Sequence, residues 1–107
     1  MTVAKPTEHG EIWWARMDKR RRVVVASRSD VRGLRGQTTV ATITRTVRSI
    51  PSEVSLDHRD GFDEACAINC DTLLTIDKSM LERRFGALSA GRVVEFDDAL
   101  RFALQLR

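Results

Sequence analysis

The sequence lacks any long apolar run. No stretch of eighteen consecutive apolar residues occurs, which argues against a membrane-spanning helix. The first ten residues, MTVAKPTEHG, also lack the apolar centre of a secretory signal. From these absences we expect a cytoplasmic protein with no membrane partner.

Cysteine is scarce as well, because Cys66 and Cys70 are the only two. On a strand, four residues span roughly 13 Å at about 3.3 Å per residue, which is too far for a disulfide. A metal site would need further ligands, yet no CxxC motif and no pair of neighbouring histidines accompanies them. We expect two reduced, buried thiols and no cofactor.

The composition is that of one folded domain with unevenly distributed charge. With 107 residues, 42% of them hydrophobic and 31% charged, the chain can build a single core. Residues 1–50 contain 11 Lys/Arg against 4 Asp/Glu, whereas residues 51–107 contain 7 against 11. This asymmetry favours a basic face for an anion and a separate acidic surface. Charged residues that only solvate the surface are the alternative.

The first half of the chain favours strands. Residues 1–9 are expected to form a short polar tail. The segment 11–17 predicts a strand with one of Trp13 and Trp14 facing inward, and we expect the outward ring to cover a loop or a partner subunit rather than to stack on a base. A tight connection leads to a second, buried strand at 23–26, VVVA.

The loops match no known ligand motif. Residues 28–37 contain two glycines and three arginines at a spacing that fits neither GxGxxG nor the P-loop, so they predict a mobile basic loop. Strands are predicted at 38–47 and 52–56. The acidic segment 57–64 lacks the twelve-residue calcium pattern and is expected to be a solvated turn around Asp60.

The second half adds short strands and helices. Strands are predicted at 65–69 and 73–76, and capped helices at 78–85 and 92–106. Short antiparallel strands usually close on themselves to hide their edges. We therefore predict that residues 10–107 form one mainly β domain with a C-terminal helix, a small antiparallel SH3-like barrel packed by helices.

One stretch combines positive charge with rigidity. Basic residues from Lys19 to Arg22 pass directly into the apolar run at 23–26, so the strand fixes Arg22 at a rigid edge. Arginine stays protonated at any ordinary pH and presents a flat fork of donors that matches phosphate oxygens. Arg22 can therefore bind the phosphate oxygens of a phosphodiester without a metal.

Several segments together resemble the MazF/PemK family of toxin endoribonucleases, the toxic halves of bacterial toxin–antitoxin pairs. They cover nearly the whole chain in the order found in the family: GEIWWARM at 10–17, RVVVASRSD at 22–30, VATITRTV at 40–47, IPSEVSL at 50–56, DGF at 60–62, NCDTLLTIDKSML at 69–81, and the terminal helix.

The resemblance implies a function and two catalytic residues. The family's catalytic arginine, which opens the second strand, falls on Arg22, and its catalytic threonine or serine falls on Thr44. The resemblance further implies a homodimeric, metal-independent RNase that cuts single-stranded RNA at short sequence motifs. It also implies a MazE-type antitoxin whose acidic tail would occupy the RNA groove.

The chemistry of RNA is consistent with these two residues. RNA carries its own nucleophile, the 2′-OH, so an enzyme need only orient it, move protons and neutralise the charge on the phosphorane. Arg22 can neutralise that charge, and Thr44 can donate a hydrogen bond to a phosphate oxygen. The general base is left open, with His58 and Asp18 as candidates by chemistry alone.

Further residues are expected to bind the substrate. Arginines near the strand ends can contact backbone phosphates, with solvated surface as the nearly equal alternative. A few polar residues are at positions that help to form the site in relatives. The sequence does not assign their roles. The predicted substrate-binding residues are Arg20, Arg21, Arg28, Arg45, Ser27 and Thr72, and Arg48 and Asp71 are weaker candidates.

The sequence departs from the family pattern in two places. Val23 stands where relatives often have proline, and only Asp18–Arg21 fill the connection where many relatives have a long glycine-bearing loop.

Two other functions are alternatives to an endoribonuclease. One is a CcdB-like gyrase-binding toxin, with determinants at residues 105–107, and the other is a catalytically inactive RNA-binding barrel.

Overall fold

The computed structural model describes residues 4–106, so Met1–Val3 and Arg107 lie outside the described part. Within it the chain forms six strands, two short 3₁₀ helices and one α-helix. Their bounds are β1 (Glu11–Arg16), β2 (Arg20–Val25), β3 (Gln37–Thr44), β4 (Glu53–Leu56), η1 (His58–Asp60), β5 (Cys66–Asp77), η2 (Lys78–Met80), β6 (Leu81–Ala87) and α1 (Ala90–Leu104).

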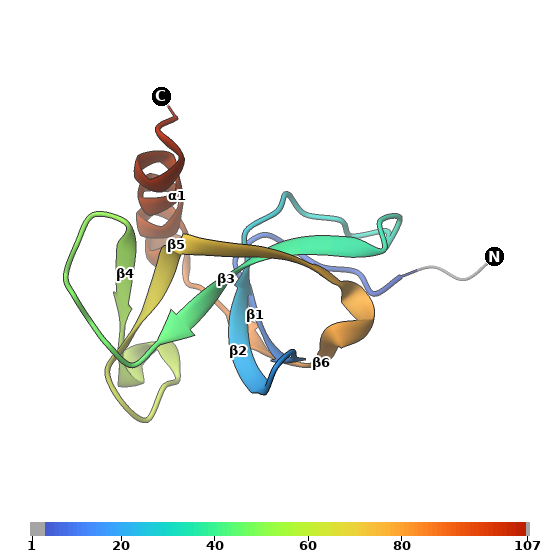
Figure 1. The fold of residues 1–107 in the computed structure, drawn as a ribbon, viewed down its shortest axis with the longest axis horizontal. Coiled ribbons are helices and arrows are strands. Elements are labelled where there is room, and N and C mark those ends of the chain that lie inside the picture. Colours follow the sequence, from blue (N-terminus) through green and yellow to red (C-terminus); the bar gives the residue numbers. More distant parts are fainter. Residues whose placement is uncertain (1–3, 107) are drawn as a thin grey trace.

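The six strands form one antiparallel sheet in the order β4-β5-β3-β2-β1-β6. The long strands β3 and β5 curve strongly, so the sheet curls into a half-barrel, and α1 stands against β4 and β5 (Figure 1). The predicted class, a small mainly β barrel with a C-terminal helix, is confirmed. Among the described residues, no helix has both the length and the apolar character needed to cross a bilayer.

Strand β2 is buried on both faces. Val24 belongs to the larger core cluster, which also contains Phe62 and Phe96, whereas Val23 belongs to a smaller cluster with Leu81. Val23, Val24 and Val25 are completely buried. The continuous apolar run therefore fixes β2 firmly, as the sequence predicts, and the strand begins earlier than expected, at Arg20.

The predicted helix over 78–85 is wrong. Only η2 (Lys78–Met80) is helical there, and Leu81–Ala87 form strand β6. This segment pairs with the free edge of β1, with Trp13 opposite Arg84 and Ala15 opposite Leu81. Pairing with an existing strand edge outweighs the helix propensity of LERRF, because it also buries Leu81 in the smaller core cluster and packs Phe85 against the larger one.

Two other element boundaries also differ from the prediction. The strands expected at 65–69 and 73–76 are one strand, β5, with a bulge where the pairing shifts from Ala41↔Leu73 to Thr42↔Asn69. Strand β3 ends at Thr44 rather than at residue 47. Cys66 and Cys70 both lie in β5 as free, buried thiols, as predicted.

The described part of the expected polar tail, residues 4–9, is packed against the protein. The backbone of Thr7 exchanges two hydrogen bonds with Asp30, of 3.1 and 2.7 Å, and Thr7 is 1% exposed. The amide of Ala4 donates to the Gly33 carbonyl at 2.9 Å. His9 contacts Asp97 of α1 at 2.7 Å. This segment therefore joins the basic loop to the helix.

A buried ion pair holds the same loop, residues 28–37, to η2. The ammonium of Lys78 lies 2.7 Å from the Asp30 carboxylate and 2.8 Å from the Lys5 carbonyl. The other contacts of the Asp30 carboxylate are the amides of Leu34 and Arg35, at 3.0 and 2.9 Å. The loop that the glycines predicted to be mobile is thus fixed at its centre.

Candidate active site

A cleft opens where β2 and β3 stop pairing. Their ladder runs from Val25↔Val40 to Val23↔Thr42, so residues 20–22 and 43–45 extend beyond the last pair. The space between them has a volume of about 720 Å³. It is lined by Trp14, Lys19, Arg20, Arg21, Arg22, Thr42, Ile43, Thr44, Arg45, Cys66 and Asn69. Arg22 and Thr44, which the sequence singled out, therefore line the same cleft.

Arg22 is held by aromatic rings. Its guanidinium carbon lies 4.5 Å from the ring centre of Phe62, 5.0 Å from that of Trp14 and 5.1 Å from that of Phe85. Within residues 4–106, no carboxylate pairs with Arg22. Its charge and its N–H groups therefore remain available to an anion that enters the cleft.

Thr44 is the last residue of β3, and its hydroxyl is oriented by the turn that follows. The Thr44 Oγ1 accepts a hydrogen bond from the Thr46 amide at 3.1 Å. A hydroxyl has one hydrogen to donate and two lone pairs. Since this contact uses a lone pair, the hydroxyl hydrogen can still be donated to an oxygen in the cleft.

The other arginines of the cleft already have acidic partners. Arg20 donates to Glu82 at 2.9 Å and lies 4.3 Å above the Trp14 ring. Arg21 makes two hydrogen bonds of 3.2 Å to Asp18. Arg45, which is strongly exposed, lies 3.8 Å from Glu64. These exposed pairs contribute little to stability, and an incoming phosphate can compete with them.

The two candidate bases lie outside the cleft lining that the described residues form. The side-chain hydrogen bonds from Arg21 lower the pKa of Asp18, so this carboxylate is a weak base. His58 is exposed in η1. We therefore give neither residue the role of general base.

Three of the predicted substrate-binding residues do not line the cleft. Ser27 accepts a hydrogen bond from the Thr39 amide at 2.6 Å and lines a different hollow, together with residues 35–39 and 75. Arg28 is exposed on the loop after β2, and its carbonyl accepts from Arg35. Thr72 is exposed on the bulge of β5 and accepts from Asn69 at 3.1 Å. Arg20, Arg21 and Arg45 do line the cleft.

The weaker candidates are also engaged elsewhere. Arg48 binds the Glu53 carboxylate through its amide and its guanidinium, both at 2.9 Å. Asp71 accepts a hydrogen bond from the Ser52 hydroxyl. Of the residues that a CcdB-like toxin would need, Gln105 caps α1 and Leu106 is exposed, while Arg107 lies outside the described residues.

Sequence reasoning missed Asn69. The bulge in β5 places it opposite Thr42, and its amide is fixed because Oδ1 accepts from the Asp71 amide at 3.0 Å while Nδ2 donates to Thr72. The polar run NCDT between two apolar stretches is the signal that could have indicated this bulge.

Sequence reasoning also missed Cys66 and the position of Trp14. Burial raises the pKa of the Cys66 thiol, against an opposing effect of the nearby Arg22 charge. Neither tryptophan of β1 faces fully outward, because both are half-buried: Trp13 packs against the smaller core cluster, and Trp14 forms a wall of the cleft on which Arg20 and Arg22 lie.

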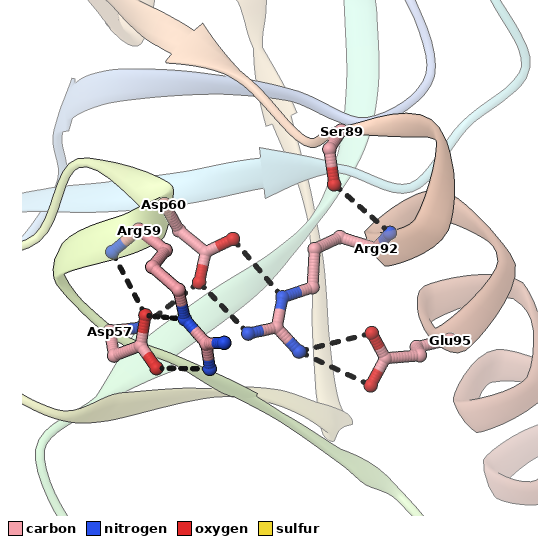
Figure 2. A network of polar contacts seen from close by, with 6 residues as sticks. All are labelled: Asp57, Arg59, Asp60, Ser89, Arg92 and Glu95. Carbon is pink, nitrogen blue, oxygen red and sulfur yellow. Dashed lines mark hydrogen bonds and ion pairs between the residues drawn. The ribbon is translucent and has the colours of Figure 1, made fainter.

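The acidic turn at 57–64 is an ordered network of ion pairs. Asp57 accepts from Arg59, whose side-chain hydrogen bond lowers the pKa of Asp57 to about 2. Asp60 accepts two hydrogen bonds from Arg92, at 3.1 and 3.2 Å, and Arg92 also contacts Glu95 (Figure 2). The turn is thus tied to the start of α1 beside the Ser89 cap.

Comparison with known proteins gives consistent matches along the chain. The family model of the PemK-like, MazF-like toxins of type II toxin–antitoxin systems matches residues 8–104. Endoribonuclease MazF3 of Mycobacterium tuberculosis is 35% identical over 92 residues, covering 86% of this chain and 89% of that protein.

Solved structures agree with this match. The structure of the Mycobacterium tuberculosis toxin MazF-mt6 superposes with a TM-score of 0.84 at 34% identity, covering 91% of this chain and 98% of that one. A MazE–MazF structure from Deinococcus radiodurans has a TM-score of 0.80 at 19% identity, covering 96% and 99%, and supports the fold alone. The chain therefore belongs to the family of PemK-like, MazF-like toxins of type II toxin–antitoxin systems.

Proposed function

We propose that this protein is a metal-independent, sequence-specific endoribonuclease that cuts single-stranded RNA in the cytoplasm and acts as the growth-inhibiting toxin of a toxin–antitoxin pair. The observation that carries the proposal is the shared cleft of Arg22 and Thr44. The endoribonuclease names of relatives such as MazF3 support it.

The reaction is a transfer of the phosphate from the 5′ oxygen to the 2′ oxygen of the preceding ribose. The bond from O2′ to phosphorus forms while the bond from phosphorus to O5′ breaks, which leaves a 2′,3′-cyclic phosphate and a 5′-OH. The proton lost by the 2′-OH is matched by the proton that the leaving 5′ oxygen gains. The enzyme must stabilise the extra negative charge on phosphorus in the transition state.

Arg22 and Thr44 supply that stabilisation. Because Arg22 has no carboxylate partner among the described residues, its full charge is free to oppose the charge on the non-bridging oxygens. The Thr44 hydroxyl donates a hydrogen bond to one of these oxygens from the opposite strand of the cleft. A fixed guanidinium thus provides the positive charge that a metal ion supplies in other nucleases.

The remaining cations of the cleft suit the RNA backbone. Lys19, Arg20, Arg21 and Arg45 line its rim, and a flexible single strand can bring successive phosphates to them. Contacts of this kind position the strand without reading its bases.

We further propose a homodimer and a MazE-type antitoxin as partners. The Deinococcus radiodurans structure, a MazE–MazF complex by its name, supports the second partner. An acidic antitoxin segment suits the basic cleft, because it can replace the RNA phosphates there. Sedimentation of the purified protein at micromolar concentration is expected to show a dimer, and a species that is only monomeric would contradict this part of the proposal.

The activity itself is tested with purified protein and single-stranded RNA in EDTA. We expect the wild-type protein to cut the RNA at a limited set of sites, and the Arg22→Ala and Thr44→Ala variants to cut it at least about a hundredfold more slowly, with a residual rate that single-turnover measurements can follow. No cleavage by the wild type, or unchanged cleavage by both variants, would overturn the assignment. Binding of RNA without cleavage would indicate an RNA-binding barrel.

A further inference from the structure

We propose that Phe62 and Phe85 are positioning residues, whose ring faces hold the Arg22 guanidinium in the orientation that it needs for catalysis. Phe62 is itself held by the turn 57–62, which Arg92 ties to helix α1. The inference rests on the proposed function of Arg22, and it assigns a role to residues that do not line the cleft.

Three rings from separate parts of the chain surround the guanidinium. Trp14 comes from β1, Phe85 from β6 and Phe62 from the turn after η1. The rings of Phe62 and Phe85 lie 5.1 Å apart, and those of Trp14 and Phe85 lie 6.4 Å apart at an angle of 78°. The rings therefore support one another and form a continuous aromatic clamp around Arg22.

Aromatic rings are suited to hold a catalytic arginine. A cation over a ring face is attracted by the π electrons, and this attraction uses neither the N–H donors nor the charge of the guanidinium. A carboxylate partner would occupy both, as Asp18 does for Arg21. The clamp thus fixes Arg22 while it leaves the donor edge available to the scissile phosphate.

Phe62 has little freedom to move. It is 2% exposed, and its amide donates to the Asp57 carbonyl at 3.3 Å. The preceding residue, Gly61, has a φ of 92°, a left-handed conformation that disfavours any side chain. A Cβ at this position would make only an ordinary van der Waals contact, 3.7 Å from the Phe85 ring, so the backbone conformation alone favours glycine here. The turn is therefore built to place Phe62 against Phe85.

Hydrogen bonds and a largely buried ion pair lock this turn. Asp57 and Asp60 form a capping box around η1, since each side chain accepts from a backbone amide of the turn. The Asp60 carboxylate also receives the fork of Arg92, from the first turn of α1 (Figure 2). Helix α1 is thus linked to Arg22 through the turn and Phe62.

The clamp can be tested by NMR without any enzymatic activity. Protons above ring faces resonate upfield, so we expect the δ protons of Arg22 to be shifted upfield in the wild-type protein and to move back in Phe62→Leu. The matched control is Phe96→Leu, because Phe96 is equally buried in the same core cluster and is not one of the three rings that lie over the Arg22 guanidinium. Arg22 resonances that are unchanged in Phe62→Leu would overturn the proposal.

The second test is a double-mutant cycle on single-turnover cleavage. Phe62→Leu and Phe85→Leu are expected to lower the rate at saturating RNA about tenfold with little change in KM, the size of one lost cation–π contact. Phe85→Tyr, which keeps the ring, is expected to retain the wild-type rate. In the Arg22→Ala background, Phe62→Leu is expected to have no further effect.

The two tests separate this inference from the proposed function. A wild-type protein that cuts no RNA would refute the nuclease, while the NMR experiment would still decide whether the clamp holds Arg22. A rate loss in Phe96→Leu equal to that in Phe62→Leu, or an additive loss in the Arg22→Ala background, would show a merely structural role.

Discussion

The hydroxyl of Thr44 provides the sharpest test of the proposed chemistry. Thr44→Val removes the hydroxyl and keeps the shape and the β-branched character of the side chain. Thr44 is the last residue of β3 and lines the cleft. Among the described residues, its hydroxyl accepts a hydrogen bond only from the Thr46 amide, at 3.1 Å. The substitution therefore separates a catalytic loss from a structural one.

The two losses differ strongly in size. A preorganised donor to a transition-state oxyanion is worth roughly 10²–10³ in kcat, so we expect the cleavage rate to fall by at least about a hundredfold. The lost Thr46 contact contributes about 1 kcal/mol or less, because the freed amide lies at the surface and can bind water. For a domain of this size, that corresponds to a decrease in Tm of about 4–8 °C at most.

The assay is single-turnover cleavage of a fluorogenic RNA at 25 °C, with thermal unfolding of the same samples. Thr46→Val is the matched control, since it removes a hydroxyl two residues away and keeps the backbone amide that contacts Thr44. We expect this control to cleave at the wild-type rate. A Thr44→Val protein that retains its fold and cleaves within threefold of the wild type would refute the role of the hydroxyl.

Three further properties can be measured directly. Arg45→Ala is expected to weaken binding to a 2′-deoxy RNA analogue, measured by fluorescence anisotropy. The slope of the logarithm of the binding constant against the logarithm of the salt concentration should decrease by about 0.7, because one phosphate contact is lost. An unchanged slope would contradict this. Since the hydrogen bond from Arg59 lowers the pKa of Asp57 to about 2, the stability that this carboxylate contributes is present above about pH 4 and is lost as the pH falls toward 2. Thermal unfolding of Asp57→Asn should therefore show a smaller decrease in Tm over that interval than the wild type, and equal decreases would argue against the pair. Burial raises the pKa of Cys70 to about 12, so this thiol is not expected to react with a disulfide reagent at pH 8 until the protein is unfolded. Rapid labelling of Cys70 in the native protein would contradict this.

The local pattern was sufficient to find Arg22, because an arginine that directly precedes a valine run is carried by the buried strand. Thr44 followed from the family resemblance, because the pattern alone extended its strand to residue 47. Both residues lie where the β2–β3 ladder stops. The predicted pair thus shares a cleft, although its catalytic role stays a prediction.

The aromatic clamp could not be predicted in the same way. Phe62 and Phe85 are distant from Arg22 in the sequence, and Phe85 lies within a segment that favours a helix when it is considered alone. Only pairing with the free edge of β1 makes this segment a strand, β6, and brings the Phe85 ring against Arg22. Ser27 lies instead just beyond the opposite end of β2, where its hydroxyl accepts from the Thr39 amide, and Thr72 is connected to the cleft only through its hydrogen bond with Asn69.

The packed segment before β1 has a practical consequence for anyone who shortens or labels this protein. A version that starts at Gly10 would remove the Lys5 carbonyl from the Lys78 ammonium and the Thr7 backbone from Asp30, so a buried charge would lose one of its partners. Truncation there is expected to give a poorly folded product, even though all strands remain. Affinity tags and fluorescent fusions therefore belong ahead of residue 4, joined by a flexible linker.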